Sequence, residues 1–295
     1  MTPPTLAHVV QPCRVSRESD LQAAQPITFE TMRRAKAYAA RAGITVDLYA
    51  TAFADEPEVV PDGFAATKPL TRSVGDVGSF NRTRKLPLIA DILGNLHEAS
   101  DADYFIYTNV DIGVLPNFYE VVAHLIDHGY DSFVINRRTL KKEAVSPEHI
   151  PLLYAEAGES HPGSDCFIFK KSHCARFQLG NICIGAAGIG RLLAINMLAY
   201  AKNFREFKDL HVTFHVGDDQ TWKSATYDDY QAHNRKESVG IVELYKRQGL
   251  LADHEIARSW VELLEAEGWL GAGPTVSRKR ESRLRQLKRL WKKVV

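Results

Sequence analysis

The sequence predicts an α/β protein with an open sheet flanked by helices, and three observations lead to this expectation. Strand-like apolar runs alternate along the chain with longer segments of helical periodicity. One of these runs, YFIYT at 104–108, has the composition of a buried strand. The chain has 295 residues, of which 45% are hydrophobic and 25% charged, so it can bury one large core.

The first part of the chain opens with a strand, a helix and a second strand. The strands are expected at 6–10 (LAHVV) and 44–50 (ITVDLYA). The helix between them is expected over 28–43, with Thr28 as its cap and a glycine as its stop. Its inner face is expected to comprise Phe29, Met32, Ala35 and Ala39. The segment 51–83 is rich in Pro, Gly and Asp and predicts loops with short strands.

The centre of the chain continues the alternation. Helical spacing predicts a helix over 85–99, and a second helix is expected from Pro116 through His128, on either side of the strand at 104–108. Another strand follows at 131–136. The segment 183–204 starts with glycines and becomes an apolar helix. Its glycine spacing reverses the dinucleotide-binding fingerprint, and no acidic residue follows at the ribose distance, so no Rossmann cofactor site is expected.

Polar side chains follow the strand at 104–108 directly. Asn109 and Asp111 stand just past its carboxyl end, where open α/β sheets bind their ligands. A nucleotide and its metal are therefore expected there. Asn109 can accept and donate hydrogen bonds to a hydroxyl, but it brings no charge. The alternative is a strand followed by an ordinary Asx turn.

Two later strands also meet polar residues at one end. Asp165 stands immediately before an expected strand at 166–169, and His215 lies near the end of an expected strand within 210–222. A positioned carboxylate can take the proton of an acceptor hydroxyl, which is otherwise a poor nucleophile. The alternative for Asp165 is a cap of the Pro-Gly-Ser-Asp turn, and for His215 a structural or exposed histidine.

The segment YFIYTNVDIGVLP at 104–116 resembles the D-x-D region of bacterial-type GT-A nucleotide-sugar glycosyltransferases, with Asn in the first acidic position. With the order of elements, the resemblance covers roughly residues 5–225. It implies a GT-A-like fold, which is an open mixed sheet flanked by helices, here with a C-terminal helical extension. It implies that Asp111 ligates a divalent cation on the donor diphosphate, that Asn109 faces the donor ribose or the metal, and that His215 completes the metal site. Imidazole suits Mn²⁺ better than Mg²⁺, so Mn²⁺ is the expected cofactor and Mg²⁺ the alternative.

The same resemblance implies roles for three other residues. Asp165 would hold or deprotonate the acceptor. Arg84 and Lys85 would meet the nucleotide, because the diphosphate leaving group develops charge that a metal only partly neutralises. Solvated surface is the alternative for both cations. His211 and His233 compete with His215, but the first begins its strand and the second lies in a polar segment.

The expected function is that of a metal-dependent glycosyltransferase, which moves a sugar from a nucleotide-sugar donor to an acceptor hydroxyl on a cell-surface glycan or glycolipid. A nucleotidyltransferase of similar fold is one alternative. Such enzymes open with a Gly-rich basic loop after the first strand, whereas 11–20 contains no glycine. A non-catalytic nucleotide-binding or glycan-binding module is another alternative.

The end of the chain has a different character. Residues 278–295 carry nine cations against a single acid, so with a net charge of +1 the rest of the chain is at about −7. Helical spacing of apolar residues there predicts a basic amphipathic helix that binds an anionic membrane surface, with a plain solvated helix as the alternative. No nucleic-acid-binding motif accompanies the charge. We expect a catalytic domain at 1–245, a helical extension at 246–277 and this tail helix.

The sequence also indicates a compartment. No stretch reaches the roughly 18 apolar residues of a membrane span, and the first residues lack a basic segment followed by an apolar run. We therefore expect a cytoplasmic protein, peripheral at the inner membrane face. The four cysteines form no C-x-x-C pair, and free thiols are expected.

Overall fold

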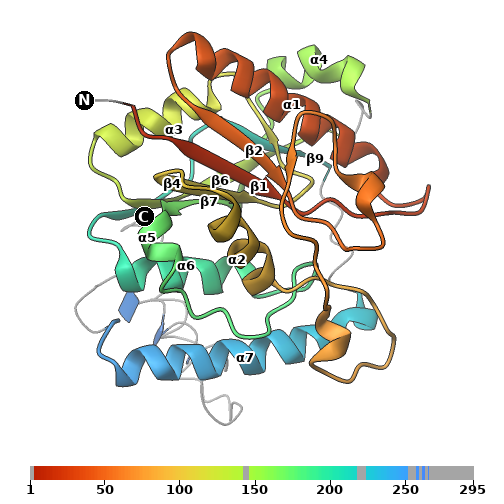
Figure 1. Cartoon of the computed structure of the whole chain (residues 1–295), viewed down its shortest axis with the longest axis vertical. Helices are drawn as coiled ribbons and strands as arrows, with labels where there is room; N and C mark the ends of the chain where they lie inside the picture. Colours follow the sequence, from red (N-terminus) through yellow and green to blue (C-terminus); the bar gives the residue numbers. More distant parts are fainter. Residues whose placement is uncertain are drawn as a thin grey trace.

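The protein is built around one central mixed sheet. The computed structural model describes residues 3–141, 146–217, 224–251, 257, 258, 261, 262 and 265. Within these residues the sheet has nine strands, with helices on both faces (Figure 1). The predicted fold class, an open mixed sheet flanked by helices, is confirmed.

The strands follow the spatial order β3-β2-β1-β4-β7-β6-β9-β5, and β8 pairs with β6 beside this path. Their bounds are β1 Leu6–Val10, β2 Val46–Ala50, β3 Ala65–Ala66, β4 Tyr104–Thr108, β5 Gly113–Val114, β6 Ser132–Leu140, β7 Glu159–Lys170, β8 Phe204–Phe207 and β9 Thr213–Val216.

The directions of the strands create one edge for ligands. β1 is parallel to β2 and β4, whereas β7 is antiparallel to both of its neighbours, β4 and β6. β6 therefore runs in the direction of β4, and β8 and β9 run parallel to β6. The carboxyl ends of β1, β2, β4, β6 and β9 thus share an edge with the first half of β7. Open α/β sheets bind their ligands at such an edge.

Helices cover the two faces of this sheet. Their bounds are α1 Leu21–Arg41, α2 Ile89–Ala99, α3 Phe118–Asp127, α4 Ile150–Ala155, α5 Lys171–Cys174, α6 Ile189–Tyr200 and α7 Asp228–Arg247. α1 and α3 pack on one face and α2 and α6 on the other, with α7 outside α6 (Figure 1).

β4 consists mainly of apolar and aromatic residues because both of its faces pack against a hydrophobic core. Tyr104 and Ile106 pack with the side chains of α1 and α3, whereas Phe105 and Tyr107 pack with those of α2 and α6. All four side chains are buried. Burial of each large apolar side chain contributes about 1.5–3 kcal/mol, so this strand anchors the residues that follow it.

The start of α1 corrects the sequence expectation. The helix begins at Leu21, and Thr28 is a buried residue inside it, so its assignment as the cap was wrong. Pro26 lies in the second turn and removes one backbone hydrogen bond. The helix continues through it, with Ala24 and Ile27 buried on either side.

The strand expected at 166–169 is longer than predicted. It is the second half of β7, so Asp165 lies inside a strand, and its alternative as a turn cap is wrong. The Pro-Gly pair predicted a break, but β6 pairs with this half of β7 through two register shifts that absorb the irregularity. β6 likewise runs past the expected end of 131–136, and Arg137 lies within it.

Smaller differences concern the element ends. α2 begins at Ile89 and not at 85, because Pro87 disfavours helical backbone at the residue before it. β9 starts at Thr213, so His211 precedes the strand and does not begin it. Among the described residues, no helix is both long and apolar enough to cross a membrane.

The expected domain limits stay predictions. α7 runs through the boundary at 245/246 and ends at Arg247. Most of the expected extension at 246–277, and the whole tail at 278–295, lie outside the described residues.

Candidate active site

Asn109 and Asp111 occupy a turn at the carboxyl end of β4. The backbone N–H of Ile112 donates to the carbonyl oxygen of Asn109 at 3.2 Å, which closes the turn. The buried Tyr107 hydroxyl donates to Asn109 Oδ1 at 3.2 Å. The turn is therefore tied to the strand before it.

The sheet register brings His215 to Asp111 from 104 residues away in the chain. β5 begins two residues after Asp111 and pairs antiparallel with β9, with Gly113 opposite Phe214. Asp111 lies two residues before Gly113 and His215 one residue after Phe214, and His215 Nε2 is 3.2 Å from Asp111 Oδ2. A Cβ at residue 113 would stand 2.4 Å from the Phe214 ring, so this register requires glycine there. The structure thus brings Asp111 and His215 together, and their role as metal ligands stays a prediction.

The environment of this pair defines its protonation. His215 Nδ1 lies 2.6 Å from the carbonyl oxygen of Gly217, which can only accept, so Nδ1 carries a hydrogen and Nε2 faces Asp111. Burial lowers the pKa of His215, but the hydrogen bond and charge of Asp111 outweigh it and raise the pKa overall. Burial raises the pKa of Asp111, and the contacts with His215 lower it overall. Both shifts favour an imidazolium at His215 beside a carboxylate at Asp111.

Asp165 lies beside this pair in a separate hydrogen-bonded group. Asn109 Nδ2 donates to Asp165 Oδ1 at 3.1 Å, and Arg137 Nη1 donates to Asp165 Oδ2 at 2.6 Å. The Arg137 and Asp165 side chains are only 12% and 13% exposed. The charge of Arg137 also lowers the pKa of both Asp111 and His215. β4, β6, β7 and β9 thus contribute charged groups to one place.

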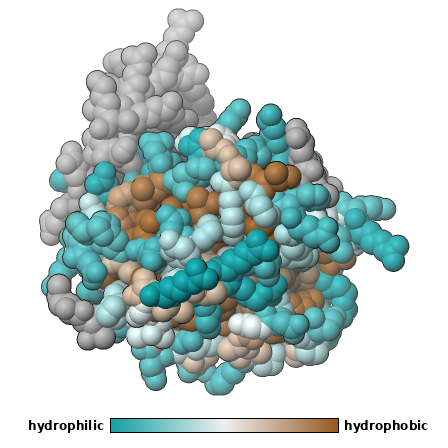
Figure 2. Space-filling model, turned by 90° about the horizontal axis from the view of Figure 1, so that it is seen from above, coloured by the Kyte–Doolittle hydropathy of each residue, from teal (hydrophilic) through white to brown (hydrophobic). Residues whose placement is uncertain are grey.

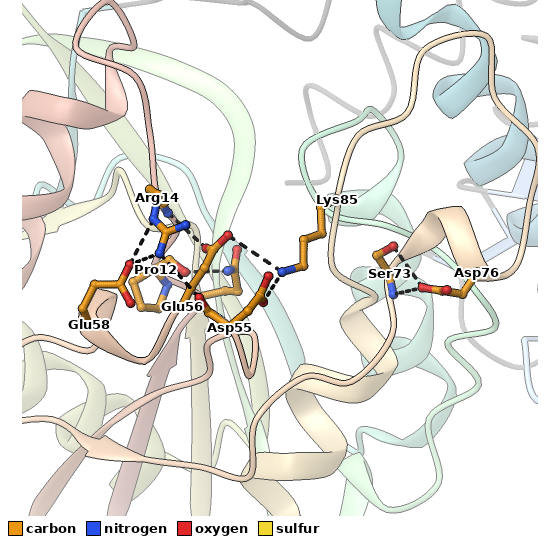
Figure 3. Close-up of polar contacts among 9 residues, drawn as sticks. Pro12, Arg14, Asp55, Glu56, Glu58, Ser73, Asp76 and Lys85 are labelled. Atoms are coloured by element: carbon orange, nitrogen blue, oxygen red, sulfur yellow. Dashed lines mark hydrogen bonds and ion pairs between the residues drawn. The ribbon is translucent and has the colours of Figure 1, made fainter.

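The structure places Arg84 and Lys85 in different surroundings. Arg84 Nη2 donates to the Thr226 hydroxyl at 3.1 Å, and its guanidinium lies 4.1 Å from the centre of the Tyr227 ring. It therefore contacts the segment that leads into α7. Lys85 instead forms an ion pair with Asp55 (Figure 3).

Lys85 belongs to a charged group that the sequence analysis treated only as loop. Its ammonium is 3.9 Å from Glu56, and Arg14 from the loop after β1 pairs with Glu58 (Figure 3). Burial, followed by the charges of Glu56 and Asp111, raises the pKa of the Cys13 thiol to about 11. The loops after β1 and β2, which carry Cys13 and Glu56, therefore lie near Asp111. The acidic residues Asp55, Glu56 and Glu58, within the loop after β2, were the available signal.

Asp111 and His215 together fit a divalent cation. Two adjacent ligands of an octahedral cation, each at about 2.1 Å, lie about 3.0 Å apart. The separation of the Asp111 and His215 atoms is close to this value. Asp111 Oδ1 is buried and has no hydrogen-bond partner within the described part of the chain. Among the described residues, no group of three or more His, Cys, Asp or Glu side chains could hold a metal, so Asp111 and His215 would supply only part of its ligands.

Comparison with known proteins gives a likeness in shape alone. No protein-family model matches the chain, and no curated protein matches it in sequence. TarS from S. aureus in complex with UDP-GlcNAc is 8% identical with a TM-score of 0.47, over 92% of this chain and 82% of that one. Glucosyl-3-phosphoglycerate synthase from Mycobacterium tuberculosis in complex with phosphoglyceric acid is 15% identical with a TM-score of 0.46, over 81% of each chain. Because these TM-scores are below 0.5, the functional conclusion rests on the site itself.

Proposed function

We propose that this chain is a metal-dependent glycosyltransferase, which transfers a sugar from a nucleotide-sugar donor to an acceptor hydroxyl. One observation carries the proposal: Asp111 and His215 meet at 3.2 Å at the ligand-binding edge of the sheet. A carboxylate oxygen and an imidazole nitrogen form a ligand set that suits Mn²⁺, with Mg²⁺ as the alternative. The buried Asp111 Oδ1 offers a further ligand atom.

The donor diphosphate would lie against this pair. Asp111 and His215 would hold the cation, which when bound supplies positive charge to the departing diphosphate. Arg137 would add positive charge near the departing diphosphate, because its guanidinium is close enough to Asp111 and His215 to lower the pKa of both. Arg84 and Lys85 remain proposed nucleotide-binding residues. Lys85 is the better placed of the two, because it pairs with Asp55 and Glu56 in the loop after β2, which lies against the loop after β1.

Asp165 would act on the acceptor. Its carboxylate is oriented by Asn109 and Arg137, and each carboxylate oxygen retains capacity for another hydrogen bond. An acceptor hydroxyl that donates to Asp165 is oriented for attack on the sugar carbon. It transfers its proton to the carboxylate as the new glycosidic bond forms and the bond between the sugar carbon and the diphosphate breaks, which releases the nucleoside diphosphate. Asn109 would face the donor ribose or the metal.

The acceptor is proposed to be a hydroxyl of a cell-surface glycan or glycolipid. The basic tail at 278–295, which lies outside the described residues, would bring the protein to the cytoplasmic surface of an anionic membrane. A membrane-bound acceptor would then be within reach of the site.

A donor screen followed by a turnover assay tests this function. The full chain is heated with UDP-, GDP-, ADP- and dTDP-sugars, each with and without MnCl₂. A true donor should raise the melting temperature only with the metal, because a ligand that binds the native state stabilises it by mass action. The stabilising nucleotide sugar should then be hydrolysed slowly without acceptor, with release of the nucleoside diphosphate.

The same assay separates the alternatives. A nucleotidyltransferase would release pyrophosphate from a nucleoside triphosphate and a sugar phosphate. A binding module would be stabilised by the nucleotide sugar and leave it intact with every acceptor offered. Either result would contradict the glycosyltransferase assignment.

A further inference from the structure

Two histidines stand one helical turn apart at the end of α3. His124 lies in the last turn, His128 caps the helix, and both side chains are exposed. Residues four apart share one face of a helix. The two imidazole rings meet on that face, with 4.1 Å between their centres.

A backbone hydrogen bond orients the second ring. His128 Nδ1 lies 2.8 Å from the carbonyl oxygen of His124. A carbonyl oxygen only accepts, so Nδ1 donates its hydrogen and Nε2 carries the lone pair of the neutral ring. Histidines that bind metals typically donate their other ring N–H to a backbone carbonyl or carboxylate in this way. The ring is thus held in a tautomer that is ready for a cation.

The electrostatic surroundings also favour positive charge. The last turn of α3 presents the negative end of the helix dipole, which stabilises cations. Asp127 lies in the same turn, and Glu120 lies one turn before His124 on the same face.

We propose that His124 and His128 form a surface site for a borderline divalent metal of the Zn²⁺, Ni²⁺ or Cu²⁺ class, with water completing the coordination. Two imidazole nitrogens suit these metals, whereas Mg²⁺ and Ca²⁺ prefer oxygen. The bound metal joins the helix end to the turn before it and thereby stabilises the last turn of α3.

This site is separate from Asp111 and His215. α3 starts just past the carboxyl end of β4 and leads back to the start of β6. Ser132 at the start of β6 pairs with Phe169, and Tyr104 at the start of β4 pairs with Lys170. The end of α3 therefore lies toward the sheet edge opposite the candidate active site. Its metal binding does not depend on the proposed function.

Zn²⁺ titration of the full chain tests the site. The protein carries His215→Ala so that the pair with Asp111 is removed, and ZnCl₂ is titrated by calorimetry at pH 7.5. The site should bind one Zn²⁺, and MgCl₂ should give no heat from it. His124→Ala and His128→Ala should each weaken Zn²⁺ binding by at least about tenfold, because loss of even an outer-shell partner typically costs 10–100-fold.

His97→Ala is the matched control, since it removes a histidine from the last turn of α2. It should leave the Zn²⁺ affinity unchanged. Nitrogen-15 spectra of the imidazoles give a second readout that needs no substitution: Zn²⁺ should shift the Nε2 signal of His128. Equal affinity in His128→Ala and its parent, or an unmoved His128 Nε2 signal at saturating Zn²⁺, would overturn the site.

Discussion

Asn109 lies beside the carboxylate of Asp165, which would repel an acidic side chain at position 109. Its amide nitrogen donates to Asp165, which also accepts from Arg137. An aspartate at 109 would place two carboxylates about 3 Å apart, where both cannot easily be ionised. The negative charge next to Asn109 is therefore carried by Asp165 of β7. This accounts for the Asn in the Asn-x-Asp sequence.

A charge exchange between these two residues tests their roles. Asn109→Asp should destabilise the fold by about 1.5–3 kcal/mol, the usual value of a hydrogen bond to a charged group. Asp165→Asn should lower turnover by about 10²-fold or more and leave nucleotide binding near normal. The double variant Asn109→Asp/Asp165→Asn restores a hydrogen bond of reversed direction. It should recover stability in urea denaturation but not turnover.

The double variant distinguishes position from net charge. Recovery of turnover along with stability would mean that the site needs one negative charge at either position. Wild-type turnover in Asp165→Asn alone would exclude any part for this carboxylate in the reaction.

At the scale of elements, His8 joins β1 to β4 and α3. Its fully buried ring is 2.9 Å from the Thr108 hydroxyl and 2.9 Å from the Tyr119 hydroxyl. Burial lowers the pKa of His8 to about 3. The unfolded chain, with an imidazole pKa near 6.5, binds this proton more readily than the native chain. Stability from His8 is complete above that value and is lost as pH falls toward 3.

This linkage predicts a measurable pH dependence. Between pH 8 and pH 5, the free energy of unfolding should fall by about 2 kcal/mol on account of His8. Urea denaturation of the wild type and His8→Gln at both pH values isolates this part, because all other groups titrate in both proteins. An equal fall in the two proteins would contradict the assignment of a neutral buried His8.

The elements also show what local sequence can and cannot predict. β4 and α6 were predicted because continuous apolar runs leave little choice but burial. The first half of β7 was missed, because its Pro-Gly pair is locally a turn and only the register shifts against β6 make it a strand. At the site, Asp111 and His215 could be predicted because both lie near the carboxyl ends of strands, and parallel strands bring these ends to the same edge of the sheet. The ion pairs of Arg14 and Lys85 join loops without periodicity, so the acidic residues at 55–58 were the only local signal and their partners could not be predicted.

At the scale of the whole molecule, the surface can be compared with the membrane prediction. Figure 2 shows hydrophilic residues over most of one face, with hydrophobic areas between them. Tyr38 and Leu152 are the exposed large hydrophobic side chains of the described residues. Single exposed apolar residues are normal for soluble surfaces. The membrane prediction therefore depends on the tail at 278–295.

Deletion of 278–295 tests that prediction. The nine cations should each be attracted to acidic headgroups by about 1 kcal/mol near the surface, and salt should weaken this attraction. The truncated protein should remain in solution when anionic liposomes are sedimented, whereas the full chain should sediment at low salt. Equal sedimentation of both proteins would remove the tail from the account.

The most direct test of the central claim is Mn²⁺ binding at Asp111. Electron paramagnetic resonance of free Mn²⁺, in the presence of UDP, measures how much metal the full chain binds. Asp111→Ala should weaken binding by at least about tenfold, and His215→Ala by less, because water can fill one position. Asp62→Ala, which removes an exposed acid elsewhere, should bind as the wild type does. Unchanged Mn²⁺ affinity in a folded Asp111→Ala protein would contradict the metal site on which the proposed function depends.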